Sequence, residues 1–225
     1  MNCRPSFTAA IAAALLATAC AGLPPARLAL PPELATTPAI ELAGIPGTRE
    51  GRFAFDHGEV RFDRGADRLS LFGAATGERS TLAFSWQPPG GAADPARCTA
   101  RRSELGGCLA VTVSPWQLLC TWSGGARLTL AQSAGAGAAT RGEREGRFEQ
   151  PGLLLTLRSV HRVQGSPLPL ADPAGYLVLH EGRVVGAVEL VGGAPRLWRQ
   201  AATPAQQQAI GQVALALALL WDPAG

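Results

Sequence analysis

Short alternations of apolar and polar residues follow one another along most of the chain. Such alternation is typical of half-buried strands. It occurs at residues 52–55, 59–62, 68–72, 80–86, 109–113, 116–122, 127–131, 153–163, 176–180, 183–191 and 196–198. No helical crossover separates these segments before residue 203, so antiparallel pairing is expected. We predict a mainly β fold of about ten strands, arranged as a curled antiparallel sheet, an open barrel or a sandwich.

The last segment of the chain has a different pattern. Thr203 followed by Pro204 is a typical helix start, and Gly211 is the one helix breaker before residue 221. The second half of the segment is apolar all round, as in a helix that is covered on several sides. We therefore predict one C-terminal helix at 203–221, packed on the sheet. The alternative is a helix that dips into a membrane or plugs a barrel, but it lacks a basic flank for lipid headgroups.

The N-terminus reads as a targeting signal. Arg4 precedes an apolar run at residues 7–19 that ends in small residues, as in a secretory signal peptide. The run is shorter than the roughly 20 residues that cross a bilayer. Residues 1–19 are therefore predicted to be a signal peptide that is absent from the mature protein.

The segment Leu16-Ala17-Thr18-Ala19-Cys20 resembles the lipobox of bacterial lipoproteins. Its leucine stands one position further from the cysteine than in the commonest form. The resemblance implies that Cys20 carries diacylglycerol and becomes the acylated first residue, a stable anchor. The non-acidic Ala21 implies the outer membrane, with the protein facing the periplasm. The alternative is an ordinary secretory peptide cut near Ala19 or Ala21, which leaves an untethered periplasmic protein.

Composition divides the rest of the chain into a tether and one domain. Residues 20–46 hold the lipidated cysteine and six prolines, which indicates a Pro-rich tether without a long helix. Residues 47–225 are long enough for a single β-rich domain. All 20 basic residues are arginines, scattered singly at a net charge of +3, so nucleic-acid binding is not expected.

Three cysteines would remain besides Cys20 in an oxidising compartment. Cys98, Cys108 and Cys120 predict one disulfide and one unpaired thiol. Cys98–Cys120 is favoured because Cys120 alternates with apolar residues on one strand face; this bond would tie down a polar loop at 99–107. The other two pairings stay open. The histidines have no metal-ligand spacing to these cysteines, so no metal or other cofactor is predicted.

Few residues suggest chemistry. The hydrolase motif Gly-x-Ser-x-Gly and the phosphate-binding motifs do not occur. Ser159 and His161 share a strand face, but no third group that would orient them is evident. Glu189 lies in a segment that is apolar on both faces and so needs a partner, either an arginine or one of His161 and His180. Such a pair more often fixes structure than performs catalysis.

Two further segments are distinctive. The Pro-rich connection at 166–175 could be pinned to the domain by Leu168 and Leu170, fold over a cavity mouth, or recognise a partner. The pentapeptide Arg-Glu-Gly-Arg-Phe occurs at 49–53 and again at 144–148, which leaves open a duplication into two similar halves.

The stretches at 159–169, 175–176 and 186–190 resemble uncharacterised lipoproteins of proteobacteria. This resemblance implies an exported lipoprotein and no particular reaction. We therefore expect a membrane-anchored periplasmic lipoprotein that is not an enzyme, a binding or envelope-assembly module for an apolar ligand or a protein partner. The alternative is a hydrolase of envelope glycan or lipid with its site around Glu189 and His161.

Overall fold

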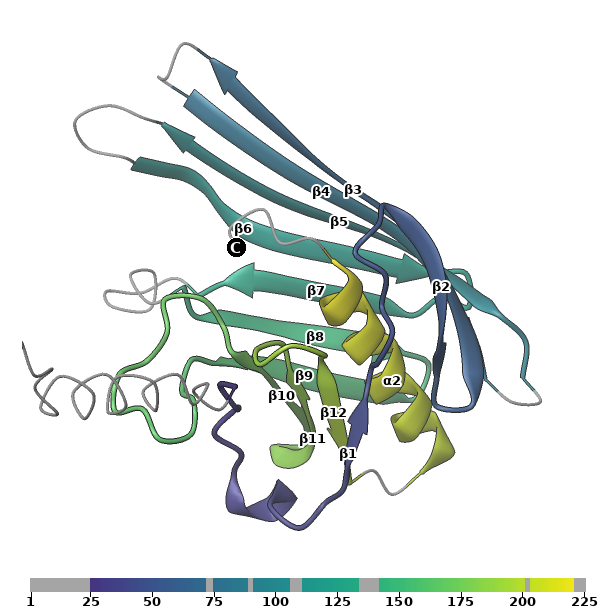
Figure 1. Cartoon of the computed structure of the whole chain (residues 1–225). Helices are drawn as coiled ribbons and strands as arrows, with labels where there is room; N and C mark the ends of the chain where they lie inside the picture. The colour runs from purple at the N-terminus through teal and green to yellow at the C-terminus, as the bar shows by residue number, and fades with distance from the viewer. Residues whose placement is uncertain are drawn as a thin grey trace, which may run out of the picture.

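The computed structural model describes residues 25–71, 75–88, 91–105, 111–133, 142–200 and 203–220. The predicted signal peptide, the predicted lipidation site Cys20 and the predicted free thiol Cys108 lie outside the described residues. The fold is mainly β, as predicted: twelve antiparallel strands form one curled, unclosed sheet, and one C-terminal helix packs on it (Figure 1).

The strands form an almost unbroken meander. Their bounds are β1 Ala39–Glu41, β2 Glu50–Phe55, β3 Gly58–Leu71, β4 Ala75–Gln87, β5 Asp94–Leu105, β6 Val111–Trp122, β7 Arg127–Gln132, β8 Arg144–Gln150, β9 Leu153–Val160, β10 Gly175–His180, β11 Arg183–Glu189 and β12 Arg196–Arg199. From β2 to β12 each strand pairs with the next in sequence, and β1 adds to β12. The two edges of the sheet are therefore β1 and β2, which are neighbours in the chain.

The strand count exceeds the predicted one because β1, β5 and β8 were not among the predicted strands, although two predicted boundaries, inside β3 and inside β6, do not exist. Residues 59–62 and 68–72 were predicted as two strands, but β3 runs without a break from Gly58 to Leu71. Strand β6 likewise continues through Ser114 and Pro115. The predicted polar loop at 99–107 is largely strand β5, which pairs with both β4 and β6. Pairing on both sides outweighs the polar composition of this segment.

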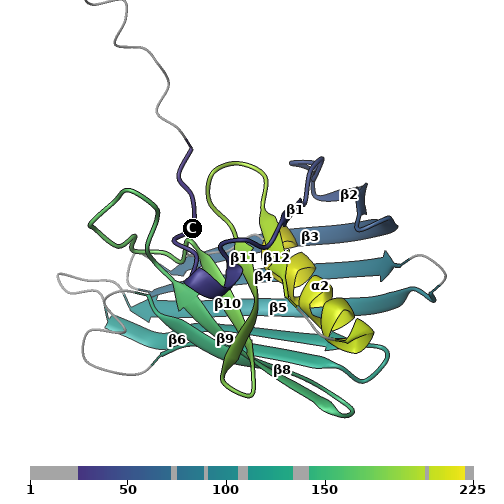
Figure 2. The same ribbon diagram turned by 90° about the horizontal axis from the view of Figure 1, so that it is seen from below.

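Helix α2, Pro204–Leu219, lies across one face of the sheet (Figures 1 and 2), which we call the inner face. The predicted start is confirmed, since the Thr203 side chain accepts a hydrogen bond from the backbone N–H of Gln206 at 3.2 Å. The helix has no charged residue, and residues 209–217 are all buried. Gly211 lies against the Trp86 ring, where a Cβ atom would be 3.0 Å from the indole. This glycine lets the helix approach the sheet closely.

The connection between β1 and β2 covers the side of α2 that faces away from the sheet. Leu42 is buried in the same core as the helix, and Arg64 reaches over to hold both segments. Its guanidinium donates to the carbonyl oxygens of Pro46 at 2.7 Å and Leu219 at 3.1 Å. Burial lowers the pKa of Arg64. A cation beside the last carbonyls of a helix is favourable, so Arg64 fixes the C-terminal end of α2 inside the curl.

The outer face of β10–β12 is covered by the N-terminal segment, so the described part of the tether predicted at residues 20–46 is docked on the domain. Leu28 and Leu34 are buried there against Ala187 and Trp198, and β1 is a strand of the sheet. The prolines do exclude a long helix, leaving one short 3-10 turn, η2 Pro32–Leu34. Leucines placed between the prolines dock the segment on the domain, because burying each one is favourable.

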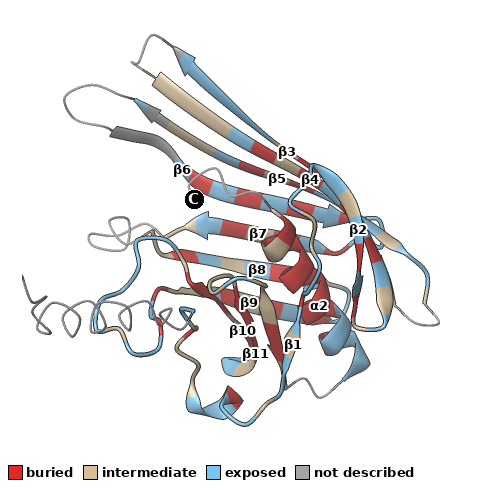
Figure 3. Ribbon diagram, in the orientation of Figure 1, coloured by how far each residue is buried: buried red, intermediate tan, exposed pale blue. Residues whose placement is uncertain are grey.

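Burial alternates along the strands (Figure 3). On the inner face, Leu82, Cys98, Cys120 and Leu128 are in the core with α2. Cys98 and Cys120 are directly opposite on β5 and β6 and form a disulfide, as predicted. Neither helical segment in the described part of the chain has the length and hydropathy that a membrane span requires.

Candidate functional site

Glu189 is fully buried on the outer face, beneath the N-terminal segment. Its carboxylate accepts hydrogen bonds from the backbone N–H of Leu28 at 2.6 Å, from Arg196 Nε at 2.8 Å and from Arg27 Nη1 at 3.3 Å. The prediction of an arginine partner is therefore confirmed, and the histidine alternatives are wrong. With three donors, this carboxylate holds the N-terminal segment and β12 on β11, a structural role.

His161 and Ser159 form a pair at the end of β9. Ser159 Oγ lies 3.1 Å from His161 Nε2, and His161 Nδ1 lies 3.0 Å from the carbonyl oxygen of Leu170. A carbonyl can only accept, so Nδ1 donates and Nε2 is left to accept from Ser159. The orienting group that the sequence did not reveal is thus a backbone carbonyl. Ser159 Oγ also accepts from the backbone N–H of Arg144 at 2.8 Å.

The structure does not bring Glu189 and His161 together. Ser159 is opposite Tyr176 in the ladder, on the inner face, whereas Glu189 shares the outer face with Ala187. Neither residue is a hydrogen-bond partner of the other. The arrangement expected for the alternative hydrolase site, a carboxylate beside an imidazole, is therefore not formed by this pair.

A cavity of about 240 Å³ opens at the C-terminal end of α2. We call it the Arg144 cavity. It lies between the end of the helix and the inner face of the sheet, and its walls are formed by Trp116, Arg144, Asp172, Pro173, Tyr176, Leu190, Pro195, Leu217, Ala218 and Leu220. Most of these side chains are apolar; Arg144 brings one positive charge and Asp172 one negative charge.

Arg144 is buried, with only 5% of its surface exposed. Its guanidinium lies over the Trp116 ring, 3.8 Å from the ring centre, and Nη1 is 3.3 Å from the Tyr176 hydroxyl. Stacking on an aromatic face offsets part of the cost of burying a cation. Trp116 Nε1 is also buried and has no hydrogen-bond partner among the described residues. The cavity therefore combines apolar walls with a cation and an N–H donor.

The Pro-rich connection at 166–175 contributes Asp172 and Pro173 to the mouth of this cavity. The leucines that were expected to pin it do not do so, because Leu168 is 73% and Leu170 is 38% exposed. The backbone holds the loop instead: the N–H of Leu170 donates to the carbonyl of His161 at 2.7 Å, and the His161 ring donates back. The connection thus lies over a cavity mouth, one of the arrangements considered for it.

The described residues contain no group of three or more His, Cys, Asp or Glu side chains that could hold a metal ion. Arg144, Trp116 and Tyr176 could not be recognised as a cluster from the sequence, since they come from β8, β6 and β10. Phe148 is the one apolar side chain of β8, so the local sequence did not mark Arg144 as a buried residue.

No family model matches the chain, and neither a curated protein nor a solved structure matches it.

Proposed function

We propose that the protein is a lipid-anchored envelope protein that binds a small apolar ligand with an acidic group in the Arg144 cavity, without catalysing a reaction. The anchor at Cys20, in the outer membrane and facing the periplasm, rests on the lipobox-like segment. The observation that carries the binding role is the buried Arg144 guanidinium in a cavity with mostly apolar walls, where Asp172 is the one acidic lining residue.

The chemistry of the walls argues for the ligand class. A binding pocket is typically apolar with a few polar groups that fix the orientation of the ligand. Leu190, Leu217 and Leu220 suit an acyl or other hydrocarbon group. A carboxylate or phosphate end would accept from Arg144 and from the unpartnered Trp116 N–H, and charge-assisted hydrogen bonds of this kind are the strong ones.

A role without catalysis agrees with the other polar groups. Glu189 is fully engaged by Arg27, Leu28 and Arg196. Ser159 Oγ already accepts a hydrogen bond from the backbone N–H of Arg144. His161 is buried under the connection at 166–175, with only 8% of its surface exposed. If the alternative hydrolase were correct, Ser159→Ala would abolish turnover of an ester substrate and leave ligand binding intact.

Two variants of α2 test the binding site. Ala218→Phe places a ring into the Arg144 cavity, whereas Ala205→Phe adds the same ring on the exposed first turn. We expect octanoate, a fatty acid short enough for the cavity, to bind the wild-type protein and Ala205→Phe equally in titration calorimetry, and Ala218→Phe at least tenfold more weakly. A wild-type protein that binds no fatty acid, or an Ala218→Phe variant that binds normally, would refute the proposal.

The anchor is tested separately by the intact mass of protein extracted from membranes. An acylated chain beginning at Cys20, and a soluble unacylated product for Cys20→Ser, are the expected results. A soluble, unacylated wild-type protein would refute the proposed anchor and would leave the proposal of ligand binding unaffected.

A further inference from the structure

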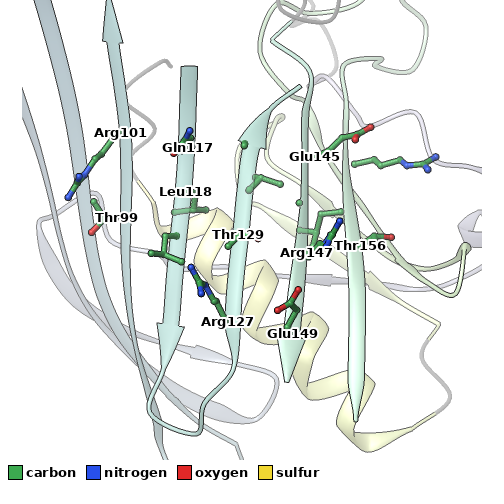
Figure 4. Close-up of a pocket in the computed structure, with 16 residues that line it drawn as sticks. Thr99, Arg101, Gln117, Leu118, Arg127, Thr129, Glu145, Arg147, Glu149 and Thr156 are labelled. Atoms are coloured by element: carbon green, nitrogen blue, oxygen red, sulfur yellow. The ribbon is translucent and has the colours of Figure 1, made fainter. Parts of the chain in front are cut away.

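A second hollow lies on the outer face of β5–β9, away from the Arg144 cavity. It is a groove of about 950 Å³ whose walls carry mostly polar side chains (Figure 4). Arg127, Arg147 and Glu149 project from neighbouring strands there. We call it the arginine groove, because Arg101, Arg127, Arg147 and Arg158 line it against two carboxylates, Glu145 and Glu149.

The strand register places three of these arginines on one straight diagonal. Arg147 is opposite Thr129 on β7, two residues from Arg127. On its other side Arg147 is opposite Thr156 on β9, two residues from Arg158. The two steps run in the same direction along the sheet, since Arg127 is level with Glu149 and Arg158 with Glu145. Diagonal neighbours of this kind are about 7–8 Å apart.

The three guanidinium groups are available to a ligand. All three residues are exposed, and none forms a hydrogen bond or ion pair with any side chain of the described residues. By contrast, the arginines at the Glu189 site and at Asp56 are all paired. A row of unpaired arginines in a groove is an electrostatic surface for an anionic chain.

We infer that the arginine groove binds an extended acidic peptide of a partner protein, with carboxylates at alternate residues. In an extended chain, alternate side chains point the same way about 7 Å apart, which matches the spacing of the arginine diagonal. Guanidinium groups bind carboxylates in a two-pronged geometry. The hydroxyls of Thr129 and Thr156, beside Arg147 in the ladder, can bond the peptide backbone.

The two glutamates favour a peptide over a denser polyanion. Glu149 and Glu145 flank the diagonal on opposite sides, each level with one of its end arginines. A chain with a charge on every unit, such as polyphosphate, would bring anionic groups against them, and like charges brought together are costly. A peptide with charges on alternate residues can place neutral side chains there.

The test uses the full chain and a fluorescein-labelled peptide that alternates glutamate and threonine over about eight residues. Binding is measured by fluorescence anisotropy at low salt, with a glutamine and threonine peptide as the neutral comparison. The groove variant is Arg127→Gln/Arg147→Gln/Arg158→Gln. Its matched control, Arg52→Gln/Arg162→Gln/Arg183→Gln, removes the same charge from exposed arginines outside the groove.

We expect the acidic peptide to bind the wild-type protein and the control variant alike, and the groove variant about tenfold more weakly. The neutral peptide should not bind, and Ala218→Phe should leave acidic-peptide binding unchanged because the two sites are separate. If both triple variants bound the acidic peptide equally weakly, the effect would be one of net charge alone, and the inference would be overturned. Tighter binding of inorganic polyphosphate than of the peptide, or no binding by the wild type, would overturn it as well.

Discussion

The same pentapeptide, Arg-Glu-Gly-Arg-Phe, leads into β2 and opens β8, and its two copies have different surroundings. In both copies the final phenylalanine, Phe53 or Phe148, points to the inner face and joins the core. The first arginine of the pentapeptide, Arg49 or Arg144, differs most in its burial and contacts. The side chain of Arg49 is 77% exposed and pairs loosely with Asp63 at 3.5 Å, whereas Arg144 is buried over Trp116.

The difference follows from the position of each strand in the sheet. Strand β2 is an edge and pairs only with β3, while β8 is interior and pairs with β7 and β9. An identical local sequence therefore gives the same strand phase in both places, and the neighbours decide what each side chain contacts. Comparing matched substitutions in the two copies separates these contributions.

The largest single loss of stability is expected at the phenylalanines. Phe148 is fully buried edge-to-face with Trp122, with ring centres 5.4 Å apart, and Phe148→Ala should lower the free energy of unfolding by about 4 kcal/mol. Phe53 is on an edge strand and 8% exposed, so Phe53→Ala should cost about 3 kcal/mol. Urea denaturation of both variants measures the difference. A greater cost for Phe53→Ala would show that the edge position does not matter.

The next largest loss of stability is expected at the glycines of the two copies, Gly146 and Gly51. A Cβ atom on Gly146 would overlap the carbonyl oxygen of Thr129, a backbone atom of the neighbouring strand. On Gly51 it would meet side-chain atoms of Pro46 at 2.9 Å and Phe62 at 3.0 Å. Because a backbone cannot move aside as a side chain can, Gly146→Ala should cost about 3 kcal/mol and Gly51→Ala about 1 kcal/mol. Equal urea midpoints of unfolding for the Gly146→Ala and Gly51→Ala variants would contradict this reasoning.

At the first arginines the more costly of the two substitutions should destabilise the protein less than at the glycines. Arg144→Ala removes the cation stacked on Trp116 and the hydrogen bond to the Tyr176 hydroxyl, so we expect a loss of about 2 kcal/mol. Arg49→Ala removes an exposed pair and should change the stability by less than about 0.5 kcal/mol. Thermal unfolding followed by circular dichroism distinguishes the two. Fatty-acid binding should fall only for Arg144→Ala, which also tests the Arg144 cavity.

The second arginines should leave stability unchanged and differ in binding alone. Arg147 lies in the arginine groove, and Arg52 is exposed on β2 outside it. Each Gln variant should unfold within about 0.5 kcal/mol of the wild type. Arg147→Gln should weaken acidic-peptide binding about threefold, as expected for one exposed ion pair. A threefold loss in Arg52→Gln would remove the distinction between the two sites.

Several features followed from local sequence. Thr203 and Pro204 marked the start of α2, and Glu181-Gly182 forms a tight turn between β10 and β11, with Glu181 at φ 50° and Gly182 at φ 80°. The apolar surroundings of Glu189 predicted a buried carboxylate with an arginine partner. In these cases the cause lies within a few residues of the chain or in the chemistry of one group.

Other features could not be predicted from the sequence because their causes are distant in the chain. Strand β5 looked like a polar loop, since Arg97, Arg101 and Arg102 dominate its composition, and only its neighbours β4 and β6 make it a strand. The predicted tether contained β1, whose partner β12 is about 155 residues away. The Arg144 cavity joins three strands with the end of α2, so no single segment carries its pattern.

The sequence by itself determined the strand-rich character of the protein, the phase of most strands and the C-terminal helix, because alternation, capping and turn chemistry act locally. Tertiary structure alone decided which copy of the pentapeptide became buried, that the connection between β1 and β2 covers α2, and which arginines stayed unpaired. These outcomes depend on strand order and register, which are set when distant segments compete to bury apolar surface. They are therefore properties of the whole sheet rather than of any of its segments.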